Sequence, residues 1–162
     1  SYKQDHGESL YRRGLYTVWK RSVLFPAFAA FDAPNREECT VRRPRTNTPL
    51  QAFVLLNDAT FVESARVFAE RVLREGGNNF ESQIGFAMEI ALARPPSSSE
   101  RSVLQSLLTD MFMHYRRKPE EAQNIIATGE WPISKDLDPV TLAAWTSVAQ
   151  AILNLDEMQT KE

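Results

Sequence analysis

The sequence predicts a mainly α-helical protein, a compact bundle of about five or six helices behind an irregular or short-strand N-terminal lead-in. From residue 48 onward, apolar side chains recur at spacings of three and four, the period of an amphipathic helix. Clusters of proline, glycine and serine interrupt these stripes where helices start and stop. The 162 residues have the size of one ordinary domain, so we predict a single domain with lead-in 1–47, helical core 48–157 and tail 158–162.

The lead-in lacks a helical pattern. Residues 14–22, GLYTVWKRS, are rich in aromatic and β-branched side chains, which predicts a short strand or an extended segment. Residues 25–38 contain two prolines, with Asp32 and Asn35 at turn positions, and this composition predicts an ordered loop. Three phenylalanines in this loop indicate that it is pinned onto a core.

The first helix is expected to begin at Thr48. The threonine side chain suits an N-cap, and Pro49 fits the first helical position, where a missing N–H does no harm. The Asn57-Asp58 pair interrupts the apolar stripe, so we expect a break or kink at residues 57–59. The stripe that is predicted to face the core consists of Leu50, Phe53, Val54, Phe61, Ala65, Phe68 and Val72.

A longer helix is expected after the break. Thr60 and Glu63 fit a capping box at its start, and Gly76-Gly77 is a natural C-terminal stop. The later helices are expected over residues 80–93, after the serine cap in the turn at 94–100, after Pro119, and from Asp138-Pro139 through Ile152.

The charge pattern excludes some partners. The net charge is −2, with a basic excess in the first 45 residues and an acidic excess in the remainder. A chain with this balance has no overall field that attracts nucleic acid or an anionic membrane. No apolar run approaches the ~20 residues that a membrane-spanning helix needs. We therefore predict no nucleic-acid partner and no membrane span.

The usual catalytic and metal-binding patterns are missing. The sequence contains no HExxH, GxSxG, GxxxxGK[ST] or GxGxxG pattern. Cys39 is the only cysteine, so no CxxC pair exists, and we interpret it as a quiet, partly buried thiol. His114 begins the basic stretch HYRRK, where it is either a cation near a helix C-terminus or a titrating site residue. We predict no catalytic residue, metal ligand or cofactor in this chain.

The best candidate site is an arginine cluster just before the first expected helix. Guanidinium groups suit carboxylate, sulfate or phosphate, and free N–H groups at a helix start also favour anions. Trp19 offers an aromatic face for a sugar ring. The candidate ligand-binding residues are Arg42, Arg43, Arg45, Thr46, Asn47 and Thr48, with Asp32, Trp19 and Asn57 as accessory candidates.

The same residues also fit a structural clasp. In an extended chain, neighbouring arginines point to opposite sides and need not converge on one ligand. Asp32, Glu37 and Glu38 are available as their partners. Asn57 likewise suits a buried polar tether at the helix break as well as a site residue. The sequence leaves both interpretations open.

Four segments carry a family resemblance: LYRRGLYTVWKRS, FDAPNREECTVRRPRTNTPLQAFVLLNDATFVESAR, ALARPPSSSE and LAAWTSVAQAILNLDE. Together, over residues 11–157, they resemble the C-terminal domain of unknown function of planctomycete-type cytochrome c proteins. The resemblance implies a large exported protein, hence an extracytoplasmic location, with a haem-binding segment upstream and none here. It also implies that this chain is the C-terminal portion of that domain. Family members often read Asn-Asp-Pro where this chain has Asn57-Asp58-Ala59.

The functional prediction is a non-catalytic module that packs against, or presents a surface to, other domains of the same polypeptide, including the cytochrome c-like segment. One alternative is a binding module for anionic ligands such as acidic glycans, which requires the guanidinium groups to share an open pocket. A second alternative is part of an enzyme whose active site is completed by the upstream region. It requires His114 or Asp32 to lie beside a large exposed apolar surface.

Overall fold

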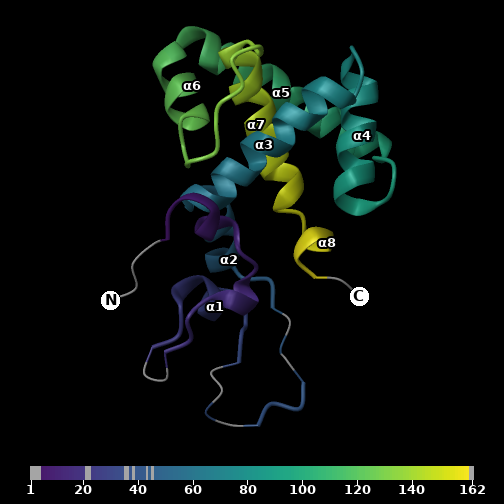
Figure 1. Ribbon diagram of the computed structural model, residues 1–162. Helices are drawn as coiled ribbons and strands as arrows, with labels where there is room; N and C mark the ends of the chain where they lie inside the picture. Colours follow the sequence, from purple (N-terminus) through teal and green to yellow (C-terminus); the bar gives the residue numbers. More distant parts are fainter. Residues whose placement is uncertain are drawn as a thin grey trace. The chain divides into compact units, whose positions relative to one another are not determined.

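The computed structural model describes residues 5–20, 23–34, 37, 39–42, 44 and 46–160. The chain divides into two compact units, Ser1–Val54 (unit 1) and Leu55–Glu162 (unit 2). The described residues form eight α-helices and no strand, and six of these helices have seven or more residues (Figure 1). The predicted mainly helical fold is confirmed. The prediction of a single domain stays a prediction.

Unit 1 begins with short 3-10 turns, one of which lies in the segment 14–22, where a strand was one of the two expected alternatives. Two 3-10 helices, Gly7–Tyr11 and Gly14–Tyr16, are followed by residues 17–20 without regular structure. An isolated strand would leave its backbone groups without partners, whereas a 3-10 turn bonds to itself. The N–H of Thr17, for example, donates to the carbonyl of Gly14 at 3.2 Å. The irregular lead-in is confirmed, and the strand alternative is wrong for these residues.

The segment expected as an ordered loop contains a short helix, α1 (Pro26–Ala30). Phe25 is extended and Pro26 takes the first helical position, which is the favourable place for proline. Trp19 stacks on Phe28 with ring centroids 5.3 Å apart, and Phe28 meets Phe25 edge to face at 5.4 Å. These aromatic contacts fasten α1 to the segment that precedes it in the lead-in.

Helix α2 (Pro49–Asn57) begins with a capping box. Thr48 Oγ1 accepts a hydrogen bond from the N–H of Gln51 at 3.3 Å, and Gln51 Oε1 accepts one from the N–H of Thr48 at 2.9 Å. The predicted cap at Thr48 is confirmed. The bond from the N–H of Thr48 back to the Gln51 side chain was not predicted, although Thr-x-x-Gln is the sequence signature of a capping box.

Helix α3 (Ala59–Glu75) follows a break of one residue. Asp58 is its N-cap, because Asp58 Oδ1 accepts a hydrogen bond from the N–H of Thr60 at 2.9 Å. The break predicted at residues 57–59 is thus confirmed. The capping box predicted for Thr60 and Glu63 is wrong, because Asp58 caps the helix and Glu63 is buried against another segment.

The remaining helices begin and end close to their predicted positions, because local caps define them. Asn79, Ser97 and Asp138 each accept a hydrogen bond from a backbone N–H of the first turn of the following helix. The helices are α4 (Phe80–Leu92), α5 (Ser98–Arg117), α6 (Pro119–Ile126), α7 (Pro139–Leu153) and the short α8 (Asp156–Gln159).

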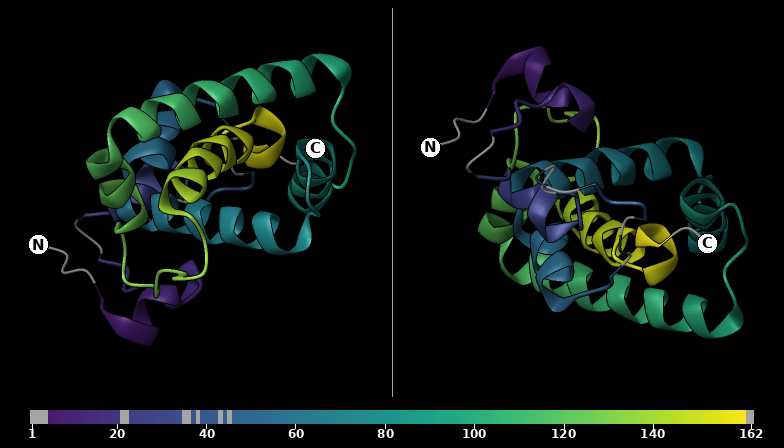
Figure 2. Two further views of the ribbon diagram at one scale, coloured as in Figure 1. Left: turned by 90° about the horizontal axis from the view of Figure 1, so that it is seen from above. Right: turned by 90° about the horizontal axis from the view of Figure 1, so that it is seen from below.

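Unit 2 is built around α7. Figure 2 shows this helix (yellow) running between α3 and α5, and α6 also packs against it. Eight of its 15 residues are buried, more than one face of a helix can supply, so α7 is enclosed by its neighbours. Alanines at 143, 144 and 149 let the surrounding helices approach closely, while Leu142, Val148 and Ile152 fill the core.

Arg94 closes the turn between α4 and α5. Arg94 Nη2 lies 2.7 Å from Glu100 Oε1, and Arg94 Nε lies 2.7 Å from Glu157 Oε2. Glu100 also completes a capping box with Ser97 at the start of α5. A single guanidinium therefore ties the first turn of α5 to α8.

This arrangement predicts an acid-sensitive contribution to stability. Arg94 first, and the contacts with Ser97 second, lower the pKa of Glu100 from 4.5 to about 2. A carboxyl whose pKa is lower in the folded state stabilises the fold above its unfolded pKa, and this stabilisation disappears as the pH falls toward the folded pKa. We expect the melting temperature, followed by circular dichroism, to fall more steeply between pH 4.5 and pH 2 in the wild type than in Glu100→Gln.

The glutamine is the matched control in that experiment, because it keeps the capping box and removes the charge. Equal slopes for the two proteins would show that the negative charge of Glu100 contributes no stability.

Charged side chains of α3 hold the loop that connects α6 to α7, residues 127–138. The Glu63 carboxylate accepts hydrogen bonds from the backbone N–H groups of Glu130 and Trp131, the second at 2.8 Å. Gly129 precedes them with φ of 93°, and a Cβ at this position would overlap the Glu63 carboxylate. Glu63 is only 3% exposed, so the loop backbone replaces solvent around its charge.

One turn further along α3, Arg66 and Glu70 form a buried ion pair of 2.6 Å between Arg66 Nη1 and Glu70 Oε1. Arg66 Nη2 also donates to the carbonyl of Trp131 at 2.7 Å, and Glu70 Oε2 accepts from the hydroxyl of Ser134 at 2.5 Å. These further bonds help to offset the desolvation of the two charges. Glu63, Arg66 and Glu70 are called the α3 latch.

Candidate functional site

A polar junction connects the end of α1 to the start of α2 within unit 1. Asp32 Oδ2 accepts hydrogen bonds from the N–H of Thr46 at 2.8 Å and from the hydroxyl of Thr46 at 2.7 Å. Gln51 Nε2 donates to Thr46 Oγ1 at 3.1 Å. Asp32 has φ of 57°, a left-handed conformation that aspartate tolerates better than most residues. The junction therefore fixes the chain just before α2.

This junction engages part of the predicted ligand-binding set. The side chains of Thr46 and Thr48 bond to Asp32 and to Gln51, so they serve the fold of unit 1. Arg42 and Asn47 are exposed. Arg43, Arg45 and the proposed partner Glu38 lie outside the described residues. Whether the arginine cluster is a clasp or a binding site stays a prediction.

Three other sequence predictions can be placed. Trp19 is half-buried against Phe28, as part of the aromatic packing of unit 1. Asn57 is exposed, so the interpretation as a buried tether is wrong, because Asp58 performs the capping at the break. Cys39 is exposed rather than partly buried, since it lies in a segment without regular structure.

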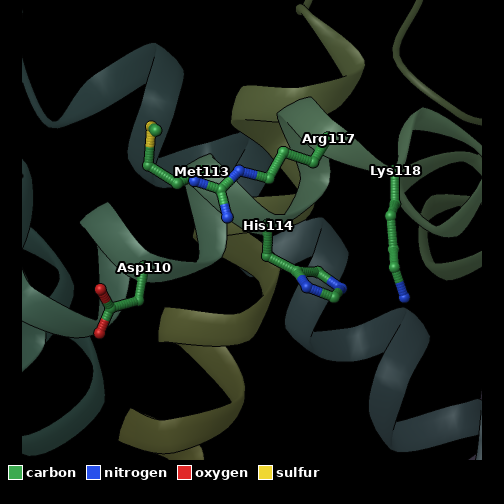
Figure 3. A pocket seen from close by; sticks show the side chains of 5 residues that line it. All are labelled: Asp110, Met113, His114, Arg117 and Lys118. Atoms are coloured by element: carbon green, nitrogen blue, oxygen red, sulfur yellow. The ribbon is translucent and has the colours of Figure 1, made fainter.

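A hollow of about 460 Å³ lies at the C-terminal end of α5, within unit 2. Figure 3 shows its lining side chains, which come from the last two turns of the helix and its C-cap. His114 lies in the last turn, as predicted. We call this feature the α5 hollow; its residues are Asp110, Met113, His114, Arg117 and Lys118.

Glu121 of α6 contacts two side chains of the α5 hollow, those of His114 and Lys118. His114 Nε2 lies 2.6 Å from Glu121 Oε2, and Lys118 Nζ lies 2.7 Å from Glu121 Oε1. The hydrogen bond to Lys118, and after it the one to His114, lowers the pKa of the Glu121 carboxyl. The bond between Glu121 and Lys118 also raises the pKa of Lys118. The basic stretch HYRRK placed His114 beside Lys118, but it did not predict the contact of both with Glu121, although Lys118 and Glu121 have the helical i,i+3 spacing.

Helix α2 has an inverted pattern of burial. Gln51 is buried, whereas Leu50 and Phe53 are 60% and 62% exposed. The prediction that these two apolar side chains face the core is wrong, because the polar bonds of Gln51 with Thr46 and Thr48 turn the opposite side of the helix inward. Large apolar side chains gathered on a surface indicate an interaction site. Unit 1 also exposes Leu15, Tyr16, Val18, Val23 and Val41.

The described ranges contain no group of three or more His, Cys, Asp or Glu side chains that could hold an ion. Among these same residues, no helix is long and apolar enough to cross a membrane. The fold and the surfaces define a helical protein with a polar junction and an exposed apolar face on α2 in unit 1, and a basic hollow in unit 2.

The chain belongs to the PSD1 family, described as protein of unknown function (DUF1553), whose family model matches residues 1–108. No curated protein and no solved structure matches the chain. The matched stretch contains the polar junction and the exposed face of α2, and it ends within α5, before the residues of the α5 hollow.

Proposed function

We propose that this chain is a non-catalytic helical module that packs against other domains of the same polypeptide. The observation that carries the proposal is the inverted burial of α2, with Leu50 and Phe53 outward and Gln51 inward. Two large apolar side chains one turn apart form a ridge that a partner surface can cover. Asp32 and Thr46 fix the chain before this ridge, so little conformational entropy is lost when it is covered.

The resemblance to planctomycete-type cytochrome c proteins supplies the proposed partner. In that setting, the module would be the C-terminal part of a large exported protein with a cytochrome c-like segment upstream, outside the cytoplasm. Haem is assigned to that segment, because the single cysteine of this chain provides no CxxC pair for attachment.

The test measures binding of the whole chain to the separately expressed upstream region of the parent protein. We expect Leu50→Ser/Phe53→Ser to weaken this binding at least 10-fold in calorimetric titrations, because buried apolar anchors dominate interface energies. The unfolding free energy of the free chain should change by less than about 1 kcal/mol, because both side chains are exposed there.

Val103→Ser is the matched control, because Val103 is 66% exposed on α5 of unit 2. Equal weakening by both variants, or no binding by the wild type, would contradict the proposal. A melting temperature raised by sulfated oligosaccharides, and no longer raised in Arg42→Ala, would support the anionic-ligand alternative. Catalysis that requires the upstream region would support the enzyme alternative.

A further inference from the structure

The side chains of the α5 hollow differ in whether another protein side chain already binds them. The two carboxylate oxygens of Glu121 form hydrogen bonds with His114 and Lys118. Within residues 46–160, all of which the structure describes, the side chains of Arg117 and Asp110 make no hydrogen bond or ion pair. The hollow therefore keeps one guanidinium with all its donors available and one carboxylate that is separate from it.

The close-up shows how these groups are arranged. In Figure 3, the Arg117 guanidinium extends back along α5 toward Met113, while the Asp110 carboxylate lies at the far end of the hollow. Met113 is 42% exposed and supplies an apolar surface to the lining of the hollow. Arginine and methionine are both enriched at recognition surfaces.

The helix dipole alone does not account for this arrangement. Cations in the last turn of a helix are favoured by its macrodipole, and this reason applies equally to Arg116 and Arg117. Of these two arginines, Arg117 lines the hollow and Arg116 does not. The two neighbours can therefore separate a general preference for positive charge from a binding site.

We propose that the α5 hollow binds a carboxylate that carries a short apolar body. The guanidinium of Arg117 is a planar fork that donates N–H groups to both oxygens of a carboxylate, and Met113 contacts the apolar body. Asp110 repels a second negative charge at the other end, which favours monocarboxylates over dicarboxylates. The carboxylate is either a free organic acid or the side chain of an acidic peptide. The proposal concerns unit 2 and does not depend on the function proposed for α2.

The test is an NMR titration of the ¹⁵N-labelled whole chain at pH 7. We expect hexanoate to give saturable shifts at residues 110–118 with a dissociation constant on the order of 1 mM, as suits a small ligand at an open site. Acetate, which lacks the apolar body, should bind several-fold more weakly. Hexanamide, which lacks the charge, should give no saturable shift. A capped peptide, acetyl-Leu-Glu-Leu-amide, that binds more tightly than hexanoate would identify the source as a peptide, and weaker binding would identify a free acid.

Three variants complete the design. Arg117→Gln should weaken hexanoate binding at least fivefold, whereas Arg116→Gln should change it by less than twofold. Met113→Gln should reduce hexanoate to the affinity of acetate. Equal effects of Arg116→Gln and Arg117→Gln, or saturable binding of hexanamide, would overturn the proposal. Unchanged circular dichroism of each variant shows that the fold is retained.

Discussion

Replacing Arg66 by methionine is expected to lower the free energy of unfolding by about 3–5 kcal/mol. Arg66 is fully buried, and its removal leaves the Glu70 carboxylate, 5% exposed, without a compensating charge. The carbonyl of Trp131 also loses the donor that lies 2.7 Å away. Urea unfolding followed by far-ultraviolet circular dichroism measures the effect.

Arg71 provides a matched control on the same helix. It forms the same i,i+4 pair with Glu75, at 3.0 Å, but the two side chains are 53% and 52% exposed. Arg71→Met should therefore change the unfolding free energy by less than about 1 kcal/mol. The double variant Arg66→Met/Glu70→Leu should be more stable than Arg66→Met alone, because no unpaired charge stays buried. Equal losses in the two single arginine variants would show that burial adds nothing to the pair.

The helix ends of unit 2 could be predicted because their causes are local. Asp138 with Pro139, and Ser97 with Glu100, contain the whole capping chemistry within four consecutive positions. Gly76 likewise ends α3 as expected. The periodicity of apolar side chains then shows which elements are helices.

The contacts of the α3 latch and the burial of α2 could not be predicted from local sequence patterns. The α3 latch joins Glu63 and Arg66 to a loop more than 60 positions away, and no local pattern encodes that distance. Glu63 was instead interpreted through its spacing from Thr60, which matched a local motif. Leu50 and Phe53 fit a helical stripe, but the stripe does not reveal that Gln51 takes the buried side. The apolar pattern predicts the helix, whereas the side that is buried depends on polar bonds that the pattern does not record, here those of Gln51 with Thr46 and Thr48.

Gly129→Ala is expected to lower the free energy of unfolding by about 2–4 kcal/mol, from two separate causes. A φ of 93° strains any residue with a Cβ, at a cost of about 1–2 kcal/mol. The new methyl group would also overlap the Glu63 carboxylate and push it away from the N–H groups of Glu130 and Trp131. The displaced carboxylate would stay buried with fewer donors, which adds to the loss.

Two comparisons separate these causes in urea unfolding experiments. Gly85 lies within α4 with no atom inside 4 Å of an added Cβ, so Gly85→Ala should raise stability by about 0.5–1 kcal/mol through helix propensity. In a Glu63→Ala background the overlap with the carboxylate is absent and only the Cβ of residue 63, 2.7 Å away, still crowds the new methyl group, so Gly129→Ala should cost less than in the wild type. A cost that is the same in both backgrounds would mean that Glu63 and Gly129 do not interact. A smaller cost in the Glu63→Ala background would show that glycine is required at position 129 for two reasons. It allows the backbone angle, and it leaves space for the Glu63 carboxylate.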